Sequence, residues 1–139
     1  MFQEKPQAFL ALPVNDAASK ALAEQIGQTI RQQGIETMLV TDVGSDGVLS
    51  DQIQSAIRRA EFVVADLTGA NPNVLFEVGM AFGLNKPMLL LSQASTKEMP
   101  FDVKTHQVAM YRPDDVGAVL RYVELWLRDV RARREATAY

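Results

Sequence analysis

The 139-residue sequence contains no cysteine and a single histidine, His106. The absence of cysteine excludes disulfide bonds and thiolate chemistry, and a lone histidine cannot form a His-rich metal site. We therefore expect no metal and no cofactor. Any catalysis by this chain has to depend on carboxylates.

The chain also lacks a long apolar run, because Glu77, Asn85 and Lys86 interrupt its most hydrophobic region. No membrane-spanning segment is predicted. Residues 1–14 carry too little positive charge and too short an apolar run for a secretory signal, so we expect a cytoplasmic protein.

Positive charge is scarce as well, since the formal net charge is −3 and the pI is near 5.1. The chain therefore has no general attraction for nucleic acid, and we do not expect nucleic acid as a partner. The sequence contains neither GxGxxG nor a Walker motif, which excludes a standard dinucleotide fingerprint and a P-loop but not phosphate binding itself.

What the sequence does contain is a regular alternation of strand and helix patterns over residues 1–139, which we interpret as one domain. Apolar residues recur at helical spacing, for example at Leu22, Ile26 and Ile30, and β-branched runs lie between the helices. The strands are predicted at 8–14, 35–40, 62–65, 88–92 and 106–111, and the helices at 17–33, 49–60, 72–84 and 116–130.

Five strands alternating with helices predict a doubly wound α/β fold of the flavodoxin or Rossmann type, with mostly parallel strands and helices on both faces. Ligands in such folds bind at the carboxyl ends of the strands, near a topological switch point. The candidate ligand loops are therefore 13–17, 41–47, 66–73 and 93–104.

Glu77 is the most informative residue, because it places a carboxylate in an otherwise apolar helix directly after an apolar strand. Burying an ionised carboxylate without partners costs several kcal/mol, so such a residue needs a reason to be there. The helix N-terminus favours the ionised form, whereas apolar walls raise the pKa. A functional carboxylate and a structural one that accepts local hydrogen bonds are the two interpretations of Glu77.

Asp66 ends the preceding strand, and Asn71, Pro72 and Asn73 begin the helix, so we expect these residues to face the ligand edge and to form one pocket with Glu77. Asp66 to Gly69 also fits a simple strand-ending turn. Asn71 is predicted as the helix N-cap, which leaves the Asn73 amide as the ligand-facing group.

The segment ADLTGANPNVLFEVGMAFGLNKPMLLL, residues 65–91, resembles the strand–loop–helix–strand signature of nucleoside 2-deoxyribosyltransferase-like proteins. It is especially similar to bacterial TIR-like domains with the same NPNV…E-G-A…K-P pattern. The later MPFDVKTHQVAMY strengthens the resemblance, since a Pro-Phe-Asp segment and a strand ending in Tyr follow in that group as well. More polar or aromatic pocket residues often stand in these relatives where this chain has Met80 and Phe82.

The resemblance implies that Glu77 acts on the anomeric carbon of a ribosyl or deoxyribosyl group and that Asp66 lies near the base or sugar. We expect substrate contacts from the neighbouring loops and helix, at Pro13, Asn15, Thr68, Gly69, Asn71, Asn73, Met80 and Asp102. Nicotinamide leaves as a neutral base without protonation, whereas a purine or pyrimidine usually needs an acid such as Asp66 or Asp102.

The predicted function is thus cleavage of the base–sugar bond of NAD or of a nucleoside or nucleotide, as hydrolase or transferase, through a glutamate. The partner is a small molecule, and we expect a homo-oligomer, because a small open sheet leaves the pocket shallow and a neighbouring copy can complete it. The alternative is a non-catalytic domain that senses nucleotides or oligomerises in signalling.

Overall fold

The computed structural model describes residues 5–39, 47–93 and 108–137. Its strands are β1 (Gln7–Ala11), β2 (Glu36–Leu39), β3 (Phe62–Asp66), β4 (Met88–Gln93) and β5 (Val108–Tyr111). They form one sheet in the order β2-β1-β3-β4-β5, and every adjacent pair is parallel. This confirms the predicted doubly wound α/β fold. The strand order reverses at β1 and β3, which makes their carboxyl ends the topological switch point.

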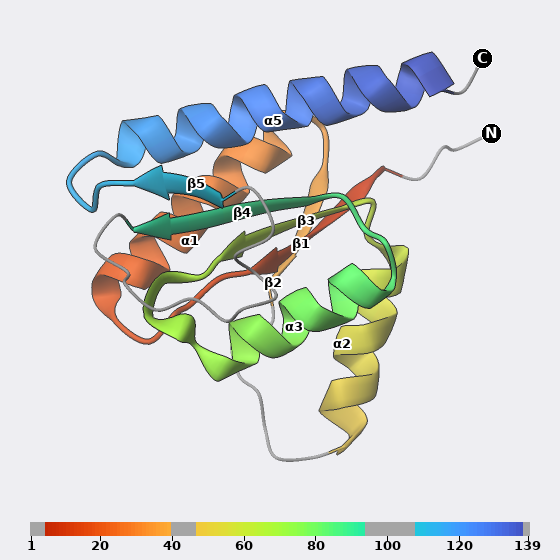
Figure 1. Cartoon of the computed structure of the whole chain (residues 1–139), viewed down its shortest axis with the longest axis horizontal. Coiled ribbons are helices and arrows are strands. Elements are labelled where there is room, and N and C mark those ends of the chain that lie inside the picture. The colour runs from red at the N-terminus through yellow and green to blue at the C-terminus, as the bar shows by residue number, and fades with distance from the viewer. Residues whose placement is uncertain (1–4, 40–46, 94–107, 138–139) are drawn as a thin grey trace.

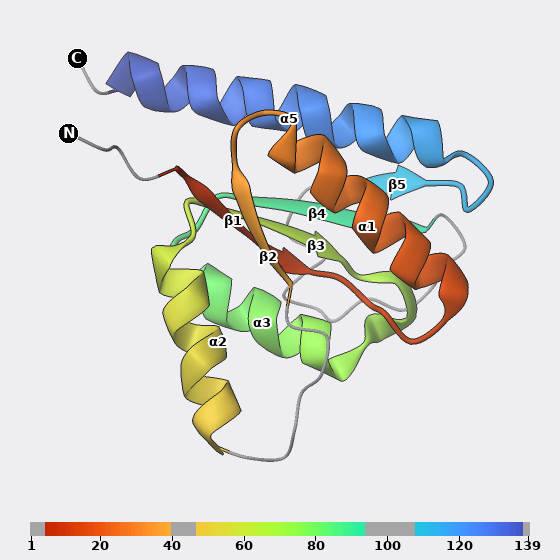
Figure 2. The ribbon, with the colours of Figure 1, turned by 180° about the vertical axis from the view of Figure 1, so that it is seen from behind.

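The helices cover both faces of the sheet and are α1 (Ala17–Arg31), α2 (Gly47–Arg59), α3 (Pro72–Gly83) and α5 (Val116–Thr137). Helices α1 and α5 lie on one face, and α2 and α3 lie on the other (Figures 1 and 2). Side chains alternate between the two faces along each strand, so that Leu10 and Val64 join the core under α1 and α5, while Phe9 and Val63 join the core under α2 and α3.

The ends of α1 and α3 follow the predicted sequence signals. Asn71 caps α3, because its side-chain oxygen accepts hydrogen bonds from the backbone N–H of Asn73 at 2.9 Å and of Val74 at 3.4 Å. Pro72 occupies the first helical turn. Gly34 after α1 and Asn85 after α3 have left-handed backbone conformations, with φ of 79° and 55°. All four residues were predicted in these roles.

Two element boundaries differ from the prediction by three residues or more. Strand β1 ends at Ala11 and not at Val14, because Pro13 lacks the N–H that a paired strand residue donates and restricts the residue before it. Helix α5 continues to Thr137, well past Val130, the last of the regularly spaced apolar positions. His106 of the fifth predicted strand lies outside the described residues, as do the predicted loops 41–47 and 93–104 except for Gly47 and Gln93.

No helix in the described ranges is long and apolar enough to cross a membrane. The longest, α5, carries arginines and acidic residues along its length.

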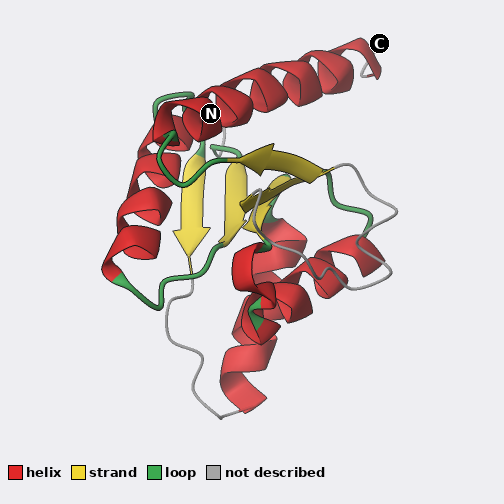
Figure 3. Cartoon of the chain, turned by 60° about the vertical axis from the view of Figure 1, so that its left-hand side comes forward, coloured by secondary structure: helices red, strands yellow, loops and turns green. Residues whose placement is uncertain are grey.

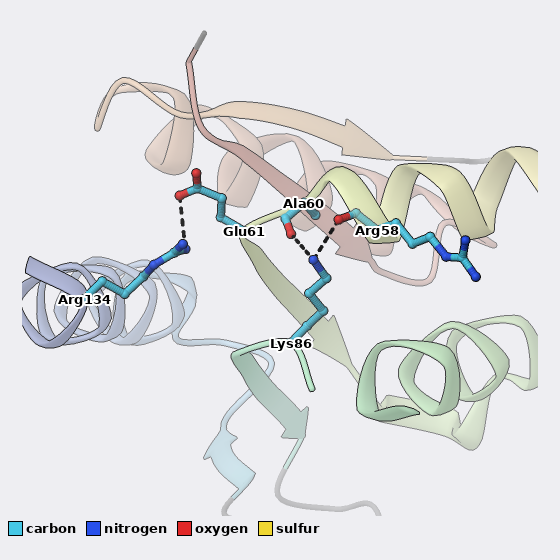
Figure 4. Close-up of polar contacts among 5 residues, drawn as sticks. All are labelled: Arg58, Ala60, Glu61, Lys86 and Arg134. Atoms are coloured by element: carbon cyan, nitrogen blue, oxygen red, sulfur yellow. Dashed lines mark hydrogen bonds and ion pairs between the residues drawn. The ribbon is translucent and has the colours of Figure 1, made fainter. Parts of the chain in front are cut away.

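The amino-terminal edge of the sheet is held by side chains that bridge separate elements (Figure 4). Lys86 extends from the loop before β4 and donates hydrogen bonds to the carbonyl oxygens of Arg58 at 2.7 Å and Ala60 at 2.9 Å, at the end of α2. Arg134 of α5 pairs with Glu61 at 3.1 Å. Lys86, the lysine of the K-P pattern, therefore stabilises the fold at the edge of the sheet opposite the switch point.

Candidate functional site at the carboxyl edge of the sheet

Glu77 lies in the middle of α3, and only 4% of its surface is exposed. Its neighbours on the same stripe of the helix are the buried Val74 and Ala81, and Val78 on the adjoining face is buried as well. The described part of the chain offers Glu77 neither a hydrogen bond nor an ion pair. Burial without such a partner raises the pKa of the Glu77 carboxyl to about 7.

The carboxylate of Glu77 keeps only slight contact with the solvent. Within the described residues, every fully enclosed side-chain nitrogen or oxygen has a hydrogen-bond partner. Since the Glu77 oxygens have none, both must keep some contact with the solvent. A nearly buried carboxylate that has no partner in the described residues is a candidate to meet a ligand.

Asp66 is equally buried, with 3% of its surface exposed, but unlike Glu77 it has hydrogen-bond partners. One carboxylate oxygen accepts hydrogen bonds from the backbone N–H of Thr68 at 3.0 Å and from its hydroxyl at 2.6 Å. The other accepts from the Tyr111 hydroxyl at 2.5 Å. The Thr68 hydroxyl in turn accepts from the backbone N–H of Gln93 at 2.9 Å.

This network ties the ends of β3, β4 and β5 together. Burial, and then the hydrogen bond to Asp66, raise the pKa of Tyr111 to about 12, so its hydroxyl keeps its proton. Tyr111 was not predicted as a site residue, and Gln93 was predicted only as the first residue of the candidate loop 93–104. The sequence signal for Tyr111 is its place at the end of the last strand, which is part of the family resemblance.

The turn after Asp66 is a short 3₁₀ segment, Thr68–Ala70, in which Gly69 has a φ of 76°. A Cβ at Gly69 would meet no atom within 4 Å, so the requirement for glycine there is conformational and not one of space. The adjoining Ala70 also has a positive φ, 49°. The turn fixes how the chain passes from β3 to the N-terminus of α3.

A cavity of about 470 Å³ opens at the switch point, on the face of the sheet that carries α1 and α5. Five residues predicted to contact substrate or to act on it line this cavity, namely Pro13, Asn15, Asp66, Thr68 and Gly69. Asp16 and Gln93, from the candidate loops 13–17 and 93–104, also line it, as do Tyr111 and Ser19, which were not predicted. Asp16 and Ser19 form the capping box of α1, in which the Asp16 side chain accepts from the Ser19 backbone N–H at 2.7 Å.

Glu77, Asn71, Asn73 and Met80 are not among the residues that line this cavity. Asn71 is occupied as the helix cap, Asn73 is exposed and Met80 is half-buried. The remaining predicted contact, Asp102, lies outside the described residues.

The two carboxylates come from opposite faces of the sheet. Asp66 continues the side of β3 that holds Val64, under α1 and α5, whereas Glu77 projects from α3, which packs on the other face. Figure 3 shows that helices cover both sides of the sheet. The described cavity therefore does not unite Asp66 and Glu77 in one pocket.

No protein-family model matches the chain, and no curated protein matches it in sequence. Among solved structures, the chain is similar to the CMP N-glycosidase BcmB of Clostridium botulinum, with a TM-score of 0.65 and 18% identity over 85% of this chain and 98% of that one. It is also similar to a 2-deoxyribosyltransferase of Bacillus psychrosaccharolyticus, with a TM-score of 0.61 and 16% identity over 82% and 95% of the two chains. A 2-deoxyribosyltransferase of Leishmania mexicana gives a TM-score of 0.54 and 21% identity over 72% and 70%.

These similarities show that the chain has the nucleoside 2-deoxyribosyltransferase-like fold. The resemblance to TIR-like domains remains a prediction.

Proposed function

We propose that this protein cleaves the N-glycosidic bond of a nucleoside or nucleotide, with Glu77 as the catalytic carboxylate. The observation that carries the proposal is the state of Glu77, which is buried and has no hydrogen-bond or ion-pair partner in the described part of the chain. Structural carboxylates in protein interiors are normally satisfied by donors, as Asp66 is here. Leaving Glu77 unsatisfied costs stability, and a functional role accounts for that cost.

The chemistry needs one carboxylate beside the sugar. As the bond between C1′ and the base nitrogen breaks, its electron pair goes to the base and positive charge develops on the sugar. An ionised Glu77 can stabilise that charge or bond to C1′. Water then releases the free sugar, which gives hydrolysis, or a second base takes the sugar, which gives transfer.

The fold supports this reaction class without fixing the substrate. The similar structures are named for action on CMP and for 2-deoxyribosyl transfer. NAD is included in the proposal, because nicotinamide leaves as a neutral base and needs no acid. For a purine or pyrimidine, a proton has to reach the departing base. Asp66, whose oxygens already accept three hydrogen bonds, suits binding of the base or sugar better than proton delivery.

The active form is proposed to be a homo-oligomer in which a neighbouring copy deepens the site around Glu77. The competing proposal is a domain that binds nucleotides without cleaving them. A single set of assays separates these possibilities.

Purified protein, separated into its size fractions, is incubated with NAD, CMP, cytidine and deoxynucleosides, and released base is measured by chromatography. We expect base release by the wild type and a loss of about 10³-fold or more in Glu77→Gln, because the amide cannot carry the negative charge that the reaction uses. Addition of a second free base distinguishes transfer from hydrolysis.

The matched control is Glu135→Gln, which makes the same change at an exposed position of α5 and should retain full activity. Base release that persists in Glu77→Gln would remove Glu77 from the mechanism. Binding of nucleotide without base release in any fraction would instead favour the sensing domain.

A further inference from the structure

Helix α5 has a second apolar stripe on the side that faces away from the sheet. Its inner stripe is buried in the core and consists of Val119, Val123, Leu127 and Val130. On the outer side, Tyr122 and Leu125 are 42% and 52% exposed. Figures 1 and 2 show α5 along one margin of the molecule, with no other described element over its outer side. The helix therefore keeps apolar surface that the described fold does not use.

The outer stripe has the spacing by which one helix packs along another. Its positions follow one another at alternating intervals of four and three residues and are Ala118, Tyr122, Leu125, Asp129, Ala132 and Ala136. This is the 3.5-residue period of a helix-packing seam, and every position except Asp129 holds alanine, leucine or tyrosine. The period favours a second helix as the partner of this stripe over a small molecule or a flat surface.

The charges at the two ends of α5 favour another copy of this chain as the source of that helix. Arg112 pairs with Asp114 at 3.3 Å just before α5, and Arg133 pairs with Asp129 near its other end. All four side chains are at least 60% exposed. Exposed pairs of this kind contribute little to the stability of a fold, so their members can exchange partners across an interface.

An antiparallel pair of α5 helices matches both the stripe and the charges. When Tyr122 of each copy packs against Leu125 of the other, Asp114 comes opposite Arg133 of the other copy, because each lies eight residues from the central contact. Parallel helices would instead place Asp114 beside Asp114 and Arg133 beside Arg133, which repel. Antiparallel helix dipoles also attract one another.

We propose that the outer stripe of α5 is the interface of a two-fold symmetric dimer of this chain, with the two α5 helices antiparallel. The symmetry repeats the contact between Tyr122 and Leu125, so both apolar side chains of both copies are covered. Helices α5 and α3 lie on opposite faces of the sheet, so this dimer leaves the site around Glu77 uncovered. The proposal therefore does not rest on the proposed function.

The test is the molar mass of the full chain, measured by sedimentation equilibrium over a range of micromolar concentrations. We expect the wild type to associate reversibly. Leu125→Glu should raise the dissociation constant about tenfold or more, because the interface would then bury unpaired carboxylates. Gln28→Glu adds the same charge at an exposed position of α1 and should associate as the wild type does.

A charge exchange tests the antiparallel alignment. Asp114→Arg alone and Arg133→Asp alone should each weaken association by about threefold or more, because like charges then meet across the interface. An equimolar mixture of the two variants should associate as tightly as the wild type, since each arginine of the mixed dimer again meets an aspartate. A mixture that associates no better than the separate variants would overturn the alignment.

Thermal unfolding checks that the variants fold, and Tyr122→Glu replaces Leu125→Glu if that variant does not. A wild type that stays monomeric at the highest concentration would overturn the proposal, and so would association that Leu125→Glu leaves unchanged. In the second case, dissociation by Phe76→Glu, at an exposed position of α3, would place the contact on the other face of the molecule.

Base release keeps this result separate from the proposed function. Leu125→Glu should release base as the wild type does, because α5 and Glu77 are on opposite faces of the sheet. Association that depends on Leu125 in a protein without base release would contradict the proposed function alone. Base release that depends on Glu77 in a protein that stays monomeric would contradict the α5 dimer alone.

Discussion

At the scale of single residues, two carboxylates of similar burial have opposite surroundings. Asp66 accepts three hydrogen bonds, whereas Glu77 has no partner in the described part of the chain. The difference follows from position. Asp66 ends a strand where a turn supplies N–H and O–H donors, and Glu77 sits inside a helix whose own N–H groups are already paired.

The burial of Glu77 makes the stability of the protein depend on pH. Its pKa in the folded protein, about 7, lies above the ordinary 4.5, so the folded state holds the proton more tightly than the unfolded state does. Stability from this group is therefore fully present below pH 4.5 and is lost as the pH rises to about 7. At about 1.4 kcal/mol per pKa unit the loss is about 3 kcal/mol.

Glu77→Gln removes this titration, so the free energy of unfolding of the variant minus that of the wild type should grow by about 3 kcal/mol between pH 4.5 and pH 8. Urea unfolding of the wild type and the variant at pH 4.5 and pH 8 measures this difference in the free energy of unfolding. A difference that stays constant would mean that the carboxyl of Glu77 is not desolvated in the fold.

Sequence reasoning reached Glu77 and Asp66 because each breaks a local pattern, one as a charge in an apolar helix and the other at the end of an apolar strand. It did not reach the partnership of Asp66 with Tyr111, which lies 45 positions further along the chain. That contact depends on β5 lying beside β4 in the sheet, and no local pattern encodes it.

At the scale of elements, Lys86 of the K-P pattern is a motif residue that stabilises the fold and does not lie in the site. Lys86 donates to two carbonyls at the C-terminal end of α2, where helix carbonyls lack partners and a positive charge is favourable (Figure 4). This contact joins α2 to the loop between α3 and β4.

Lys86→Met keeps most of the side-chain length and removes both hydrogen bonds. We expect a loss of about 1–3 kcal/mol in the free energy of unfolding, because the carbonyls near Ala60 lose a charged donor. Chemical unfolding measures the change. Lys20→Met, at an exposed position of α1, should change stability little, and an equal loss in both variants would refute the capping role.

Most elements could be predicted because periodicity and caps agree, as at Asn71 and Pro72 for α3. The end of β1 was predicted three residues too late, because Leu12 and Val14 continue an apolar pattern although Pro13 cannot pair as a strand residue. The residues after Ala11 instead line the cavity, and that space results from how α1 and α5 pack against the sheet.

At the scale of the whole molecule, the strand order places the ends of β1 and β3 at the switch point, where half of the predicted site residues line one cavity. The same fold occurs in an N-glycosidase and in deoxyribosyltransferases. Fold alone does not assign an activity, so the proposed function depends on what Glu77 does.

The most direct measurement is the pH dependence of kcat/KM for base release. If Glu77 acts as an ionised carboxylate with a pKa of about 7, the rate should rise about tenfold per pH unit below pH 7 and level off above it. In Glu77→Gln, any residual release should lack this transition. A kcat/KM that changes by about twofold or less between pH 5.5 and 8.5 would contradict the role given to Glu77. A rate that levels off near pH 4.5, as expected for an ordinary glutamate, would contradict it as well.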